Sequence, residues 1–263
     1  MMYVSFRLVC VRRVAACIPR KCFLQATSFY CKLQCDDGHW AGDYGGPFFL
    51  LPGLVLTCHI CSYDLGEARR DAIIAYMKNH QQADGGWGLH MEGPSTMFGS
   101  ALHYCALRAL GLKRDDPEIE KARNWIHKNG TALAIPSWGK FWLSTFGVYD
   151  WKGCNSIPPE LWLLPRWFPF HPWRMWCHAR MVYLPMSFIY GGRYTSKIGS
   201  LQEELREELY TEPYNEINWD KARNNVCKKD LYSPHTKLMD FLNEILKFYE
   251  KCPLTSVRNR YVS

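Results

Sequence analysis

Two short stretches of the sequence have residue types and spacings that could bind a metal. The segment Cys58–Cys61 (Cys-His-Ile-Cys) has the spacing of half a zinc site, but no second half follows at a suitable distance. The segment Asp115–Ile119 (Asp-Asp-Pro-Glu-Ile) is acidic, but it lacks a second acid at the spacing that an aspartate-rich magnesium motif needs. We therefore predict no metal site and no cofactor. The first stretch is interpreted as buried thiols on an apolar helix, and the second as a helix cap.

Tryptophan is the most unevenly placed residue type. Eight of the 11 tryptophans lie between residues 125 and 176 of a chain of 263 residues. With 48% hydrophobic residues, a chain of this length can bury a substantial core. The formal net charge is +7, but no zinc finger or RNP motif accompanies it, so the sequence does not indicate a nucleic-acid reader. No run of 18 apolar residues occurs, so no membrane-spanning helix is predicted.

Helix signals recur along the chain after residue 25. Asp116 is a predicted N-cap, with Pro117 at the first helical position. Ser233-Pro234 precedes an amphipathic segment that runs from Leu238 to Tyr249. Another helix is expected after Pro94-Ser95, with a buried stripe formed by Phe98, Ala101, Leu102, Cys105 and Ala109. The predicted fold class is all-α, with irregular connections from residue 151 to 172.

A repeat of 47 residues emerges when glutamine and tryptophan positions are aligned. Gln34, Gly38 and Trp40 in the first copy match Gln81, Gly85 and Trp87 in the second. A third, degenerate copy is predicted around residues 121–138. Repeats of this length are typical of stacked helix pairs. A glutamine at a helix end can bond terminal backbone groups, while the glycine and tryptophan make and cover the turn.

Four blocks of sequence resemble the oxidosqualene cyclases of the lanosterol synthase type, in the terpene cyclase/mutase family. The blocks are Gln34–Pro47, Asp84–Ser100, Ala134–Leu143 and Met175–Ser187, and the repeats resemble the QW motifs of that superfamily. The similarity runs from about residue 24 onward. It implies a partial α/α barrel for residues 24–263, an N-terminal barrel domain left incomplete. Residues 1–23, which are basic and contain no acid, are predicted to be an atypical N-terminal segment.

The resemblance implies conversion of (S)-2,3-epoxysqualene to lanosterol in sterol biosynthesis. In that family an Asp in an Asp-Cys-Thr-Ala motif protonates the epoxide, and a cation-driven ring cascade ends with loss of a proton. No such motif occurs in this sequence. The resemblance also implies a lipid substrate, no nucleic-acid partner, and monotopic association with the endoplasmic reticulum membrane or with lipid droplets.

Carried over position by position, the resemblance assigns five site residues. Trp138, Trp176, His178 and Tyr44 correspond to substrate-binding residues that line the cavity, and His178 is also implicated in late cation stabilisation or deprotonation. Tyr183 corresponds to the tyrosine at the narrow passage for substrate entry. Beside it, Ala179 stands where a cysteine is usual in the family, and the smaller side chain is expected to widen the passage slightly.

Two alternatives remain open at this point. Without the resemblance, a histidine on a helix face such as His178 is more often a satisfied core residue, and most tryptophans are packing residues. A different hypothesis for the whole chain is a non-catalytic product, either a truncated isoform or an incomplete gene model. In that case the amphipathic helix near residue 245 would leave its apolar face exposed.

Overall fold

The computed structural model describes residues 19–40, 45–169, 171–231, 236–251 and 255–262. Within these ranges the secondary structure consists of helices and isolated bridges, without a strand. The α-helices are α2 (Pro19–Cys31), α3 (Leu50–Ile60), α4 (Glu67–Asn79), α5 (Met97–Ala109), α6 (Pro117–Lys128), α7 (Ser137–Phe146), α8 (Cys177–Gly191), α9 (Ser200–Glu208), α10 (Trp219–Ala222), α11 (Lys237–Tyr249) and α12 (Thr255–Val262). Five short 3-10 helices connect them: η1 (Ala132–Ala134), η2 (Trp151–Gly153), η3 (Pro159–Leu163), η4 (Pro172–Arg174) and η5 (Lys228–Asp230). The predicted all-α class is confirmed.

The chain divides into two compact units, residues 1–45 and residues 46–263. In the first unit, the described part consists of α2 and the turn that follows it. The predicted N-terminal segment falls largely on residues 1–18, which lie outside the described residues. Its predicted end at residue 23 falls inside α2, so that boundary stays a prediction.

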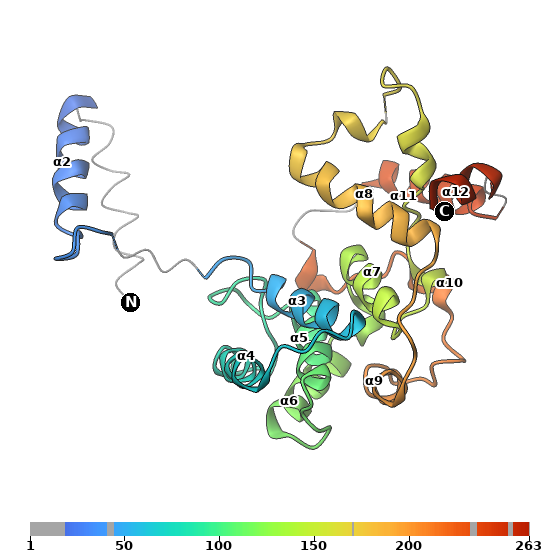
Figure 1. Cartoon of the computed structure of the whole chain (residues 1–263), viewed down its shortest axis with the longest axis horizontal. Coiled ribbons are helices and arrows are strands. Elements are labelled where there is room, and N and C mark those ends of the chain that lie inside the picture. The colour runs from blue at the N-terminus through green and yellow to red at the C-terminus, as the bar shows by residue number, and fades with distance from the viewer. Residues whose placement is uncertain (1–18, 41–44, 170, 232–235, 252–254, 263) are drawn as a thin grey trace. The chain divides into compact units, whose positions relative to one another are not determined.

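Helix α5 is the centre of the larger unit (Figure 1). It contacts α3, α4, α6, α7 and α9, and all but one of its residues are buried. Thr96 caps its start by accepting a hydrogen bond from the backbone N–H of Gly99, two residues after the predicted opening at Pro94-Ser95. The predicted stripe lies in the core, with Ala109 at its partly buried end. An apolar surface on every side is the expected pattern for a helix surrounded by others.

The predicted caps and connections are largely confirmed. The Asp116 carboxylate accepts a hydrogen bond from the N–H of Glu118 at the start of α6, as the cap hypothesis requires. Helix α11 covers the predicted amphipathic segment, although Ser233-Pro234 lies outside the described residues. From residue 151 to 172 the described chain is irregular apart from short 3-10 turns. Cys58 is buried as predicted, but Cys61 is exposed, so the interpretation as two buried thiols is half wrong.

The 47-residue repeat forms the same turn twice. In each copy the glutamine Nε2 donates to the glycine carbonyl, at 2.6 Å for Gln34 and 2.8 Å for Gln81. In each copy the tryptophan Nε1 donates at 2.8 Å to a backbone carbonyl ten residues earlier. Gly38 and Gly85 take φ values of +91° and +94°, a conformation that glycine adopts without steric cost. The first two copies of the repeat are therefore confirmed.

The third, degenerate copy has Gly130 at the glutamine position, so the side-chain hydrogen bond of the other two turns cannot form there. Trp125 corresponds to Phe29 and Tyr76 of those copies, and its Nε1 donates to Asp84 of the second copy at 2.8 Å. Trp125 therefore links α6 to the turn of the second copy.

No helix in the described ranges is both long enough and apolar enough to cross a membrane.

Candidate functional site

Trp138 on α7 belongs to a cluster of three aromatic rings with Phe98 on α5 and Phe49, the residue before α3. Its ring centroid lies 5.5 Å from that of Phe49 and 6.1 Å from that of Phe98, and the two phenylalanine rings are 5.3 Å apart. The Trp138 residue is 39% exposed, so part of its surface remains open. The cluster offers an aromatic surface of the kind that binds apolar or cationic ligands.

A buried lysine fixes the helix that carries Trp138. Lys140 is fully buried, and its Nζ donates to the carbonyl oxygens of Ala222, Arg223 and Asn225 at 2.6, 2.7 and 2.9 Å. These carbonyls lie at the end of α10, where helix carbonyls lack partners within the helix. Burial lowers the pKa of Lys140 to about 8. The lysine thus anchors α7 to a segment more than 80 residues later in the chain.

Trp176 and His178 form a second group at the start of α8. Trp176 is the residue before the helix, and His178 lies in its first turn. Their ring centroids are 4.5 Å apart with an interplanar angle of 73°. Trp176 is 72% exposed and His178 is exposed as well. The alternative of a satisfied core histidine is therefore wrong for His178 in the described structure.

Tyr183 lies further along α8 and is half-buried. Its hydroxyl donates to the carbonyl of Pro158 at 3.2 Å, and its ring lies 6.0 Å from Trp162. These contacts tie α8 to η3 and hold the tyrosine side chain in place. Ala179, whose small size bears on the predicted passage, is exposed on the same helix.

Trp173, three residues before Trp176, is in contact with two arginine side chains of the same chain. The guanidinium carbons of Arg166 and Arg180 lie 4.6 and 4.8 Å from the centroid of Trp173. Such stacking uses the aromatic face for a cation of the chain. Trp173 is therefore a poorer candidate for a ligand than Trp176, although both are exposed.

The structure brings together Trp176 and His178 but does not join them to Trp138. No ring contact between the two groups occurs among the residues that the structure describes. Tyr44 lies outside the described residues. Sequence reasoning missed Phe49, Phe98 and Lys140 as parts of the site. Two signals were available: Phe98 lies on the predicted buried face, and Lys140 lies in the Ser-Trp-Gly-Lys motif.

Comparison with known proteins places these residues in a family. Residues 24–263 match the squalene-hopene cyclase N-terminal domain. Over 235 residues the chain is 51% identical to lanosterol synthase of Mus musculus, covering 89% of this chain and 32% of that protein. It is 49% identical to the human lanosterol synthase over 239 residues, covering 91% and 33%. It is also 49% identical to cycloartenol synthase of Dictyostelium discoideum over 245 residues, covering 93% and 35%.

The chain spans about a third of the length of these relatives. The match to the domain covers nearly all of the sequence and agrees with the helical structure, which has the α/α barrel-type fold of that domain. The chain therefore belongs to the squalene-hopene cyclase N-terminal domain family, and its predicted likeness to the oxidosqualene cyclases of the lanosterol synthase type is confirmed.

Proposed function

We propose that this chain contributes one wall of the substrate cavity of an oxidosqualene cyclase that converts (S)-2,3-epoxysqualene to lanosterol. The observation that carries the proposal is the identity of about half of the aligned residues to the mouse and human lanosterol synthases. Because the chain spans about a third of those proteins, the activity is proposed for a longer protein that includes this chain.

The aromatic groups suit a reaction that passes through carbocations. A carbocation in a dry cavity cannot be stabilised by water without being quenched, so the cavity wall must supply the stabilisation. A desolvated aromatic face contributes about 2 kcal/mol to a nearby cation. Trp138 and Trp176 are each partly or largely exposed and can present a ring to a ligand. Tyr44 is proposed as a further wall residue by family resemblance.

His178 is the proposed participant in the last step. The initiating acid adds a proton to the epoxide oxygen, and the final cation loses a proton, so the overall reaction is an isomerisation. A neutral imidazole can accept the departing proton directly or stabilise the cation before proton loss. The Trp176 ring, 4.5 Å away, limits the positions that the imidazole can take. Tyr183, held by the Pro158 carbonyl, is proposed to border the substrate entrance.

We expect the 263-residue chain alone to form no lanosterol, because its sequence contains no Asp-Cys-Thr-Ala motif to protonate the epoxide. The measurement is incubation of the purified chain with 2,3-oxidosqualene, followed by mass spectrometry of the extracted triterpenes. Lanosterol formed by the chain alone would overturn this part of the proposal.

The catalytic proposal is tested by joining the chain to the part of mouse lanosterol synthase that follows its matched region. The chimeric protein is expressed in cells that lack their own lanosterol synthase. We expect lanosterol from the chimera, and reduced yield or altered products from Trp176→Ala and His178→Ala. Trp167→Ala is the matched control, because Trp167 is also an exposed tryptophan, at 74%, and is not among the proposed site residues.

Each outcome of the chimera experiment has a separate meaning. Cycloartenol in place of lanosterol would show that the proposed product is wrong and that the proposed class of reaction, cyclisation of oxidosqualene, is right. A cooperatively folded chimera without any cyclic product would overturn the catalytic role. Unchanged yield and products from His178→Ala would remove His178 from the site.

We also infer monotopic association of the longer protein with the endoplasmic reticulum membrane or lipid droplets, on the basis of family resemblance. Co-flotation of the purified chimera with phosphatidylcholine vesicles is the test. A chimera that makes lanosterol but stays with the soluble fraction would overturn this inference and leave the proposed reaction intact.

A further inference from the structure

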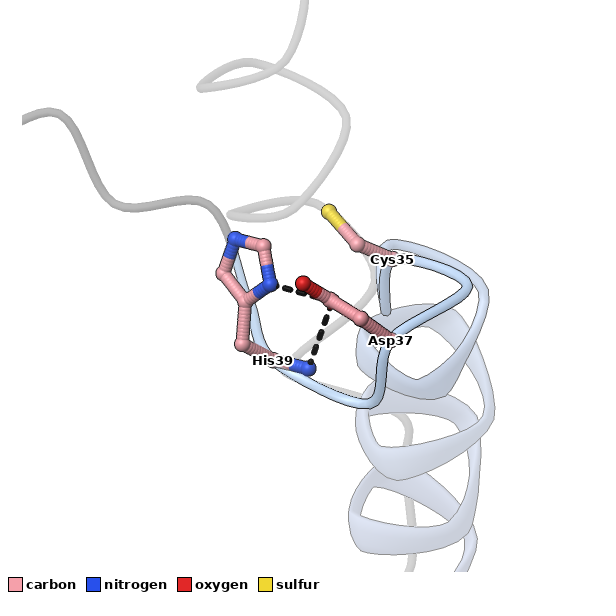
Figure 2. Close-up of side chains that lie close together, drawn as sticks. All are labelled: Cys35, Asp37 and His39. Carbon is pink, nitrogen blue, oxygen red and sulfur yellow. Dashed lines mark hydrogen bonds and ion pairs between the residues drawn. The ribbon is translucent and has the colours of Figure 1, made fainter.

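We propose that the turn after α2 binds a divalent cation of the zinc class, with Cys35, Asp37 and His39 as its ligands. The three side chains come from alternate positions of one turn and project to the same side of it (Figure 2). Their ligand atoms all lie within 4.8 Å of one another. The inference is independent of the proposed cyclase reaction, which needs no metal.

The backbone of this turn is held by its own hydrogen bonds. The N–H of Cys35 donates to the carbonyl of His39 at 2.8 Å, and the N–H of Gly38 donates to the carbonyl of Cys35 at 2.9 Å. The Gln34 side chain donates to the carbonyl of Gly38 at 2.6 Å. The ligand-bearing residues therefore need little further ordering to receive an ion, which reduces the entropic cost of binding.

The second copy of the turn shows that these ligands are not needed to form it. Gln82 and Gly86 occupy the positions of Cys35 and His39, and the N–H of Gln82 donates to the carbonyl of Gly86 at 2.9 Å. Both copies also use an aspartate in the same way, since Asp37 and Asp84 each accept from the N–H two residues later. A thiol and an imidazole at positions 35 and 39 are thus additions to a turn that forms without them.

The aspartates of the two copies differ in what surrounds them. Asp84 accepts hydrogen bonds from Ser95 Oγ at 2.6 Å and from Trp125 Nε1 at 2.8 Å, so its carboxylate is engaged in packing the larger unit. Asp37 is 70% exposed and contacts the His39 imidazole and backbone. The Asp37 carboxylate and the His39 imidazole thus meet at an exposed turn and offer two of the ligand types that zinc accepts.

The ligand types select the class of ion. Thiolate and imidazole favour zinc, cobalt and related ions, whereas magnesium and calcium favour sets of oxygen ligands. Tetrahedral zinc with bonds of about 2.0–2.3 Å places its ligand atoms about 3.3–3.8 Å apart. Separations of up to 4.8 Å must shorten to reach that range, whereas the Asp37 contact with His39 must lengthen. Three protein ligands leave a fourth position for water, as in zinc sites that are not purely structural.

Cobalt titration of the full chain is the test, because a thiolate bound to Co2+ gives a charge-transfer absorption in the near ultraviolet. The chain is purified with a reductant and freed of metal. We expect one equivalent of Co2+ to produce this absorption, and Zn2+ to abolish it by displacement. Cys35→Gln, which installs the residue of the second copy, is expected to remove the absorption while the chain remains folded. His39→Gly, likewise matched to the second copy, is expected to weaken Co2+ binding at least tenfold.

Cys61→Ser is the control for thiols elsewhere, because Cys61 is exposed in the larger unit. This variant is expected to keep the full absorption. The proposal is overturned if the wild-type chain gives no thiolate absorption, or if Cys35→Gln retains it. Binding that is lost in Cys61→Ser and kept in His39→Gly would place the ion elsewhere and overturn the proposal as well.

Discussion

At the scale of single residues, the ionisable side chains most deeply placed in the core have structural tasks. Lys140 gives its three protons to carbonyls at the end of α10. His103 is fully buried, with Nδ1 bonded to the carbonyl of Gly99 at 2.8 Å. Its ring lies 5.3 Å from Trp87 and 4.3 Å from Phe48. Neither residue is exposed to a substrate in the described structure.

His103 makes the stability of the chain depend on pH. Burial lowers its pKa from 6.5 to about 4, so between these values the unfolded state binds more protons. Stability is therefore lost as the pH falls from about 6.5 to about 4, by roughly 3 kcal/mol at most. We expect His103→Asn, which keeps a polar group near the Gly99 carbonyl, to flatten this slope. Urea unfolding at several pH values measures the pH dependence of the unfolding free energy. The same pH dependence in wild type and variant would show that His103 does not cause it.

Replacing Lys140 tests the anchor between α7 and α10. Lys140→Met retains most of the volume but leaves three carbonyl oxygens without their donor, and we expect a loss of about 2–4 kcal/mol of unfolding free energy. Lys128→Met, on the exposed end of α6, is the control and is expected to change stability by less than about 0.5 kcal/mol. Equal effects of the two substitutions in urea titrations would refute the anchoring role.

At the scale of elements, helix ends are joined to distant parts of the chain by side chains. Both carboxylate oxygens of Asp230, in η5, accept from the first backbone N–H groups of α5, those of Met97 and Phe98, at 2.7 and 2.8 Å. On the other half of α5, Tyr104 and Arg108 donate to Glu208 of α9 at 2.5–3.0 Å. The central helix is thus fixed at both ends by acids from the C-terminal half of the chain.

Removing the Asp230 carboxylate leaves two N–H groups at the buried start of α5 without their acceptor. We expect Asp230→Ala to lower the unfolding free energy by about 1–3 kcal/mol, the range for lost caps and unsatisfied buried groups. Asp115→Ala removes an exposed carboxylate as a comparison. Thermal unfolding followed by circular dichroism should separate the two; coincident transitions would argue against a capping role for Asp230.

The sequence predicted those parts of the fold that depend on neighbouring residues. The α6 cap at Asp116 and the first two copies of the turn are set by residues within a few positions of one another. The contacts of Asp230 with Met97, and of Lys140 with Ala222, join positions more than 80 residues apart. Contacts between residues so far apart in the sequence cannot be predicted from the spacing of neighbouring residues. The ring contact between Trp176 and His178 joins residues two positions apart, whereas the contact of Phe49 with Trp138 joins residues far apart in the sequence.

At the scale of the whole chain, the described structure carries apolar side chains on its surface. The exposed residues of α11 include Leu238, Phe241, Ile245 and Phe248, with exposed fractions from 48% to 76%. A helix with one apolar stripe is expected to bury that stripe. The helix signals in the sequence predict this helix, and its apolar residues are exposed in the structure.

We expect the exposed apolar face of α11 to promote self-association of the isolated chain. Phe248 is 76% exposed, so Phe248→Glu is expected to change unfolding free energy by less than about 0.5 kcal/mol while reducing association. Light scattering of the 263-residue chain over a range of concentrations is the measurement. Scattering as strong in Phe248→Glu as in the wild type would show that another surface drives association.

The duplicated turn also gives the chain an internal reference for tolerance to substitution. A Cβ atom at Gly86 would lie 2.7 Å from both Ser100 Oγ and Ser95 Cβ, so only a hydrogen atom fits there. The equivalent position in the first copy holds the exposed side chain of His39. Positions 39 and 86 thus have equivalent places in the turn, but a side chain has room at position 39 and none at position 86. A library of all residues except proline at position 39 should yield folded proteins throughout, whereas the same library at position 86 should retain glycine alone.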